Sequence, residues 1–240
     1  MTHPKFPGPD SSLCVLYHDF ERLDDTGLLW YDRGPNKLHA TPVGYAAPNY
    51  GLARTARGKG YATFNGANQW AELAGGVQGS FYAVAPSSGY TAVLVARHTT
   101  PVALARIFNC RNGAATRGIG IRYLAVDQML AAAWDAGGVA TQINETAAIQ
   151  YVSRTRVSIY AMAKTAGTAS IWHDTVQVAA TFAGNTNPIA YDATVVPTIG
   201  SLTGGGNPFT GTMYALILYR DYIPSHAEAV SMSRFWRDRI

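Results

Sequence analysis

Hydrophobic and polar positions divide the chain into short segments that are bounded by turn residues such as Gly, Pro, Asn and Asp. In one segment Val157, Ile159 and Ala161 alternate with polar or aromatic residues, which is the period of a half-buried strand. Residues 91–96 form a near-continuous apolar run, which is typical of a strand buried on both faces. The predicted strands are 13–20, 28–31, 60–73, 90–97, 103–109, 118–123, 129–134, 157–163, 170–173, 176–181 and 211–220.

One helix is predicted, near the end of the chain. Ser225 and Glu228 have the spacing of a capping box, and Pro224 directly before them helps to end the preceding strand. The helix is expected to run to about residue 238. Short strands about ten residues apart with a single helix indicate an all-β sandwich or barrel, and residues 42–60 read as a long loop that could carry contacts.

Laid end to end, these segments resemble the laminin-G-like family of concanavalin-type jelly rolls. The resemblance covers about residues 13–238 and implies a two-sheet antiparallel jelly-roll sandwich with one short C-terminal helix. It rests on motifs in the family's order, which speak to fold more than to function. They are the opening strand 17–20, the turn 32–41, a Phe-x-Gly hairpin at 60–73, the central strand 90–95, the hairpin 171–176 with Thr175 in place of Gly, and the closing strand and helix from 209.

Residues 1–12 precede this domain, which we assign to 13–240. They hold three prolines and no periodic pattern, so we expect an extended N-terminal arm. It is either a disordered tail or a strap that orders on a neighbouring subunit, with Lys5 and Phe6 as its partner-binding residues.

Charge is scarce and unevenly placed along the sequence. Only 14% of the residues are charged, so either other subunits cover part of the surface or uncharged polar residues form it. From Asp10 to Asp32 there are six acids and one base, whereas ten Lys and Arg and a single acid, Glu72, lie between Asp32 and Asp127. This asymmetry favours contact between copies or with a partner, unless folding interleaves the two regions.

The net charge of +4 and the absence of a recognised motif argue against nucleic acid as a partner. No segment is long and apolar enough for a membrane span, and the N-terminus lacks the apolar core of a signal peptide.

Catalytic and metal-binding patterns are weak. Asp19 and Glu21 are the one pair of acids at alternate positions, and a glycoside hydrolase of this fold would need such a pair; a solvated strand end explains them equally simply. The histidines lack metal-ligand spacing, and we expect no cofactor. Calcium is possible at Asp24, Asp25 and Asp32, although these residues also suit turn capping. Pairing of Cys14 with Cys110 stays open.

Aromatic side chains are the candidates for sugar binding, because ring faces stack on the apolar faces of sugars. Tyr45, Tyr50, Trp134 and Trp172 lie at predicted loops or hairpin edges, whereas Trp70 is expected in the core.

The favoured interpretation is a non-enzymatic structural or adhesion module. Stand-alone domains that resemble this family are often bacteriophage virion proteins, so the resemblance implies a capsid decoration, fibre or tail component. Such a component would be made in the host cytoplasm and would contact other subunits of a large assembly, in homo-oligomeric or capsid-associated form. The alternatives are a lectin-like module that binds surface glycans, a cytoplasmic protein, and a glycoside hydrolase.

Overall fold

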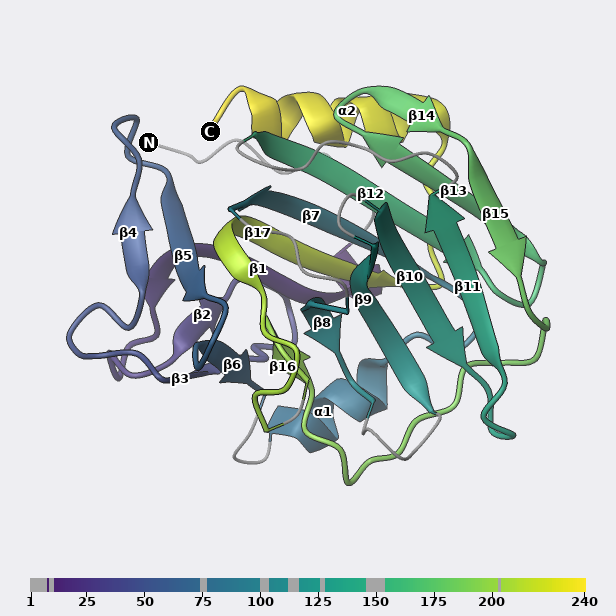
Figure 1. The fold of residues 1–240 in the computed structure, drawn as a ribbon, viewed down its shortest axis with the longest axis horizontal. Coiled ribbons are helices and arrows are strands. Elements are labelled where there is room, and N and C mark those ends of the chain that lie inside the picture. Colours follow the sequence, from purple (N-terminus) through teal and green to yellow (C-terminus); the bar gives the residue numbers. More distant parts are fainter. Residues whose placement is uncertain are drawn as a thin grey trace.

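The computed structural model describes residues 8, 11–73, 77–99, 104–111, 117–125, 128–145, 154–202 and 204–240. Over these residues the chain forms two antiparallel sheets packed face to face, which confirms the predicted sandwich (Figure 1). The predicted arm residues Lys5 and Phe6 lie outside the described part of the chain.

The first sheet, sheet A, has nine strands within the described residues. Strand β17 (Thr210–Arg220) lies near its middle, with β7 (Tyr90–His98) on one side and both β1 (Cys14–Leu23) and β5 (Gly60–Asn65) on the other. The remaining strands are β12 (Thr155–Ala163), β13 (Thr168–His173) and β14 (Val176–Val178) beyond β7, β2 (Trp30–Asp32) beyond β1, and β4 (Leu52–Arg54) beside β5.

The second sheet, sheet B, has eight strands among the described residues. Their order is β15 (Ala180–Ala183), β11 (Ala140–Glu145), β10 (Gln128–Trp134), β9 (Gly118–Ala125), β8 (Arg106–Asn109), β16 (Thr198–Ile199), β6 (Trp70–Glu72) and β3 (Thr41–Val43). The inward side chains of both sheets form the main core, and strand alternation selects them: in β11, Thr141, Ile143 and Glu145 are buried while the residues between them are partly exposed.

Two predicted strands are each divided between the sheets. Residues 60–73 were expected to form a hairpin, but β5 belongs to sheet A and β6 to sheet B, so the chain crosses the sandwich between them. Residues 176–181 divide in the same way into β14 and β15. Local alternation cannot distinguish a hairpin from a crossing, because both present the same period of two.

Among the described residues, three helical segments accompany the sheets. A 3₁₀ turn, Ser11–Leu13, precedes β1, and α1 (Val77–Val84) closes one end of the sandwich with Phe81 fully buried in the core (Figure 1). Helix α1 was not predicted, and it has no acidic residue in its first turn and no basic residue in its last. The third segment, α2 (His226–Arg237), matches the predicted helix and covers the outer face of sheet A with Ala229, Met232 and Trp236.

The capping box predicted for α2 is present. Ser225 is extended, its Oγ accepts the backbone N–H of Glu228 at 3.3 Å, and the Glu228 carboxylate accepts the backbone N–H of Ser225 at 2.8 Å. Two backbone donors at the first turn are thereby satisfied, so the start of α2 is fixed over the sheet.

We predict that Ser225→Ala lowers the free energy of unfolding by about 0.5–2 kcal/mol, because the cap contact is lost. Reversible urea unfolding measures the change. Ser231→Ala is the matched control, since Ser231 lies exposed within α2 and is not a cap. Equal unfolding midpoints for Ser225→Ala and Ser231→Ala would contradict the prediction.

Candidate functional site

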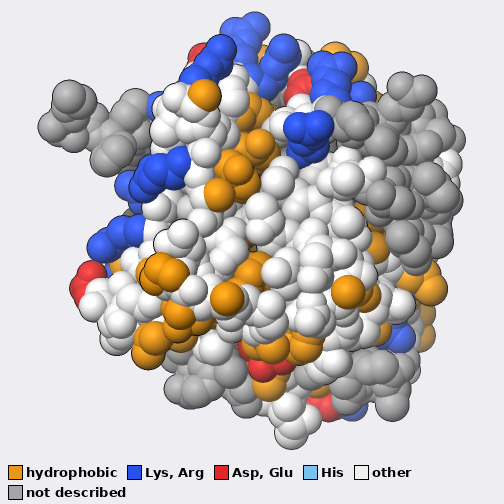
Figure 2. Space-filling model, turned by 60° about the vertical axis from the view of Figure 1, so that its left-hand side comes forward, with side chains coloured by type: hydrophobic (Ala, Val, Ile, Leu, Met, Phe, Trp, Pro, Cys, Tyr) orange, Lys and Arg blue, Asp and Glu red, His pale blue; other side chains and the backbone are white. Residues whose placement is uncertain are grey.

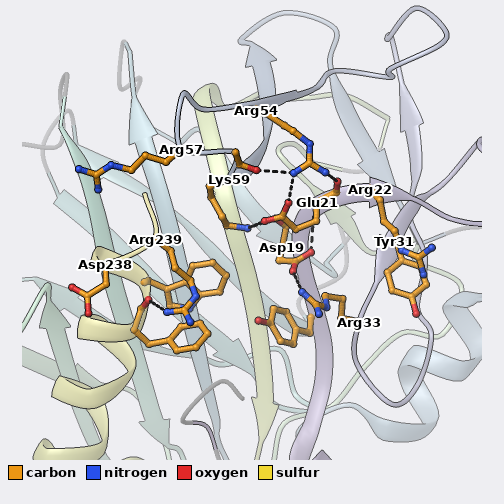
Figure 3. A pocket seen from close by; sticks show the side chains of 14 residues that line it. Asp19, Glu21, Arg22, Tyr31, Arg33, Arg54, Arg57, Lys59, Asp238 and Arg239 are labelled. Atoms are coloured by element: carbon orange, nitrogen blue, oxygen red, sulfur yellow. Dashed lines mark hydrogen bonds and ion pairs between the residues drawn. The ribbon is translucent and has the colours of Figure 1, made fainter. Parts of the chain in front are cut away.

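An open cleft lies on the outer face of sheet A, beside the C-terminal end of α2 (Figure 3). Its volume is about 860 Å³, and the described residues that line it include six cationic side chains and three carboxylates, so we call it the basic cleft. Its lining residues are Tyr17, Asp19, Glu21, Arg22, Tyr31, Arg33, Arg54, Arg57, Gly58, Lys59, Phe235, Trp236, Asp238 and Arg239. In Figure 2, Lys and Arg side chains gather along the upper and left margins of the surface.

Strand β1 supplies the two carboxylates at the centre of the basic cleft. His18 and Phe20 are buried, with Phe20 in the core between the sheets, and the alternate residues Tyr17, Asp19 and Glu21 line the cleft. Phe20 has a φ of 53°, a left-handed conformation that interrupts the regular strand at this point. The pair Asp19 and Glu21 that the sequence singled out therefore shares one cleft.

Each of these carboxylates is held by cations from another part of the chain. Arg33 donates to Asp19 at 2.5 Å. Lys59 and Arg54, which flank the turn between β4 and β5, donate to Glu21 at 2.6 and 2.9 Å. Asp19 and Lys59 are nearly buried, so the network is screened less than surface ion pairs are.

The pKa of Glu21 is lower than its ordinary value. Burial alone would raise it, but hydrogen bonding and charge attraction from Lys59, the backbone N–H of Gly60 and the charge of Arg54 together outweigh burial. Glu21 is therefore a carboxylate at neutral pH, a state suited to accepting hydrogen bonds rather than to donating a proton.

Aromatic rings and guanidinium groups form the walls. The guanidinium carbon of Arg22 lies 4.0 Å from the ring centre of Tyr31, and that of Arg239 lies 3.5 Å from the ring centre of Phe235. Lys59 is 5.0 Å from the ring of Trp236. Stacked guanidinium groups keep hydrogen-bond donors free at their edges, so the cleft offers flat apolar surfaces next to donors and acceptors.

The four aromatic residues predicted to bind sugar are not brought together by the fold. The ring of Tyr45 packs on Trp30 and its hydroxyl donates to the carbonyl of Thr63 at 2.5 Å, while the carbonyl of Tyr50 accepts from the indole of Trp30. The Tyr45 ring thus packs against the core, whereas Tyr50 contacts Trp30 through its backbone carbonyl.

Trp134 and Trp172 are almost fully buried, on the outer faces of different sheets. Trp172 packs beneath α2 and its indole N–H donates to His226 at 3.2 Å, while Trp134 belongs to a small cluster on sheet B. Trp70, which was predicted to be a core residue, is only half-buried on β6, and its indole N–H donates to Glu72.

The predicted calcium ligands serve other roles in the structure. Asp24 accepts the backbone N–H groups of Leu28 and Leu29, and Asp32 is buried and accepts those of Tyr17, Gly34 and Leu38. Asp25 is exposed beside Arg22. The described residues contain no group of three or more His, Cys, Asp or Glu that could hold a metal ion. Both cysteines are buried and unpaired.

Sequence reasoning missed most of the basic cleft because three of its six cations, Arg54, Arg57 and Lys59, come from the segment that was predicted to be a long loop, and the others from three separate parts of the chain. Arg54, Arg57 and Lys59 are interleaved with aromatic residues there, which was a usable signal for a binding surface. The pairing of β4 with β5, and of β5 with β17, brings these cations to the acids of β1.

Comparisons with known proteins show the fold. No protein-family model and no curated protein matches the chain. Domain 4 of AbnA, an arabinanase from Geobacillus stearothermophilus solved with arabinotriose, is similar over 92% of this chain and 98% of its own, with 14% identity and a TM-score of 0.59. A structure of botulinum neurotoxin type C, a toxin whose cell entry depends on interaction with two ganglioside molecules, matches 94% of this chain with 7% identity and a TM-score of 0.64.

A third similar structure is the CBM40 of a Ruminococcus gnavus sialidase bound to sialyllactose, with 14% identity, a TM-score of 0.50, and coverage of 64% of this chain and 87% of that one. The chain spans about half of the neurotoxin chain. These likenesses show that the chain has a β-sandwich fold. No helix in the described parts of the chain is long and apolar enough to cross a membrane.

We predict that Glu21→Gln reduces the loss of stability on acidification. Because folding lowers the pKa of Glu21, its ionised form stabilises the native state above the unfolded-state pKa, about 4.3. That contribution is lost as the pH falls through the folded-state pKa. Urea midpoints at pH 6 and pH 3 should therefore differ less for Glu21→Gln than for the wild type.

The matched control for the loss of one negative charge is Asp25→Asn, since Asp25 is exposed near the same strand end. The expectation is wrong if Glu21→Gln and the wild type lose the same stability between the two pH values.

Proposed function

We propose that this protein is a non-enzymatic, lectin-like module that binds carbohydrate in the basic cleft. The observation that carries the proposal is the composition of its walls: partly exposed aromatic rings, guanidinium donors and carboxylate acceptors line one open cleft. Sugars present apolar ring faces that stack on aromatic groups and hydroxyls that both donate and accept hydrogen bonds.

The comparisons support a glycan as ligand more than they support any other partner. Similar structures include an arabinanase domain with arabinotriose and a sialidase module with sialyllactose, and both bear their sugars on a β-sandwich. Transfer of that role to this chain is our inference, since the identities are 14%.

The setting in which the module acts is a separate proposal. A sandwich with few charges and a proline-rich N-terminal segment suits an adhesion component of a larger assembly, such as a virion, with glycan binding as its contact to a surface. The proposal of a larger assembly rests on the sequence alone.

We predict that a glycan array probed with the full chain gives saturable binding, and that Tyr31→Ala and Arg57→Gln each weaken it at least tenfold. Both residues line the cleft, and neither is a buried core residue. Arg154→Gln is the matched control, because Arg154 is exposed and does not line the cleft. Absence of binding across the array, or equal losses for Arg154→Gln and Arg57→Gln, would overturn the assignment.

We further predict no turnover on a panel of polysaccharides. Lys59 and Arg54 hold Glu21 ionised, and Arg33 engages Asp19, so neither carboxyl is arranged as a proton donor. Reducing-end assays should give the same background for the wild type, Asp19→Asn and Glu21→Gln. Product formation that either substitution abolishes would show a hydrolase instead.

A further inference from the structure

The outer face of sheet B carries a second concentration of positive charge, away from the basic cleft on sheet A. In β9, Ile119, Ile121 and Tyr123 belong to the core between the sheets, so Gly120 and Arg122 take the opposite face by alternation. On the neighbouring strand β10, Leu130, Ala132 and Trp134 form a separate apolar cluster on that same outer face. Arg122 therefore stands beside a buried apolar cluster.

Two arginines face each other across β8 and β9. Arg106 and Arg122 are direct partners in the strand register, where side chains lie about 5 Å apart at their Cβ atoms. A third arginine, Arg111, lies over the ring of Trp134 at 4.5 Å. Like charges opposite one another destabilise a sheet, so this arrangement carries a cost in the free protein.

Arg106 is buried, and part of its guanidinium group forms no hydrogen bond. Its residual exposure is 4%, and its Nε and Nη1 atoms have no partner; the Nε of Arg122 is likewise buried and unpartnered. Within the described residues no carboxylate forms an ion pair with either side chain. Burial, with added repulsion from Arg122 and Arg111, lowers the pKa of Arg106 to about 10.

A buried cation normally has an anion beside it, because an unpaired buried charge is expensive. Among the described residues, no carboxylate pairs with the guanidinium groups of Arg106 and Arg122. Two hydrogen-bond acceptors on the same sheet also lack partners. The Oδ1 atoms of Asn109 and Asn144 are buried and unbonded. Gly120 lies between Arg106 and Asn109: a Cβ added there would be 3.8 Å from both Arg106 Nη1 and Asn109 Oδ1. The glycine thus keeps a side chain out of this space.

We propose that the outer face of sheet B binds an oxyanion, the carboxylate or sulfate of an acidic sugar, through the guanidinium groups of Arg106 and Arg122. Paired guanidinium donors match the two oxygens of such a group, and the free oxygens of Asn109 and Asn144 accept hydrogen bonds from sugar hydroxyls. The choice of a sugar rests on the proposed function; the oxyanion site itself rests on the unpaired arginines.

The test is calorimetric titration of the full chain with sodium glucuronate, sodium sulfate and glucose, at constant ionic strength set with sodium chloride. We expect saturable binding of at least one of the two anions and none of glucose. Arg106→Gln and Arg122→Gln should each raise the Kd at least tenfold, whereas Arg154→Gln, at an exposed residue outside both sites, should leave it unchanged. Tighter binding of glucuronate identifies a uronic-acid type of sugar, and tighter binding of sulfate a sulfated one.

Melting curves without ligand add a second readout. If Arg106 is a ligand-binding residue with no partner in the free protein, Arg106→Gln should melt at or above the wild-type temperature; a clear decrease would indicate a structural role and overturn the proposal. Failure of both anions to bind, or binding that survives Arg122→Gln, would also overturn it. Glycan-array binding that depends only on Tyr31 and Arg57 would leave the proposed function intact even if the anion site failed. Anion binding that depends on Arg106 and Arg122, with no binding of any glycan on the array, would support the anion site and overturn the proposed function.

Discussion

The placement of β17 in the middle of sheet A is the constraint on which the rest of the structure depends. Both of its faces are buried: Met213, Leu216 and Leu218 enter the core between the sheets, while Ala215 and Ile217 lie beneath α2. The strand also pairs with three others from earlier parts of the chain. Sheet A is therefore complete only when β17, in the last quarter of the sequence, has paired with these strands. The same pairing brings α2 to the edge of the basic cleft.

The two sheets use their outer faces differently. On sheet A, α2 covers part of that face, and the basic cleft lies where the helix ends beside β1. The outer face of sheet B has a buried apolar cluster with Arg106 and Arg122 next to it. Each proposed site thus lies where apolar side chains and cationic side chains are neighbours. This combination suits a ligand with both apolar and charged parts.

The uneven charge along the sequence is resolved only in part by folding. Arg33, Arg54 and Lys59 return to the acidic strand β1 and pair with Asp19 and Glu21. Arg106 and Arg122, from the later part of the acid-poor stretch, do not return there, since β8 and β9 belong to the other sheet. Folding therefore matches the charge at β1, while Arg106 and Arg122 form no ion pair with a carboxylate of the described residues.

By itself the sequence determined the all-β class, most strand positions and the capped helix, because period-two alternation and the box at Ser225 and Glu228 are local features. It could not determine which sheet a strand joins: β5 and β6 share one alternating segment yet lie in different sheets. Nor could it reveal either site, because the cleft joins β1 to residues 54–59 and to the C-terminal end of α2, and Arg106 meets Arg122 only through strand pairing. Contacts between residues so distant in sequence are set by how two sheets bury their apolar faces, which only the tertiary structure decides.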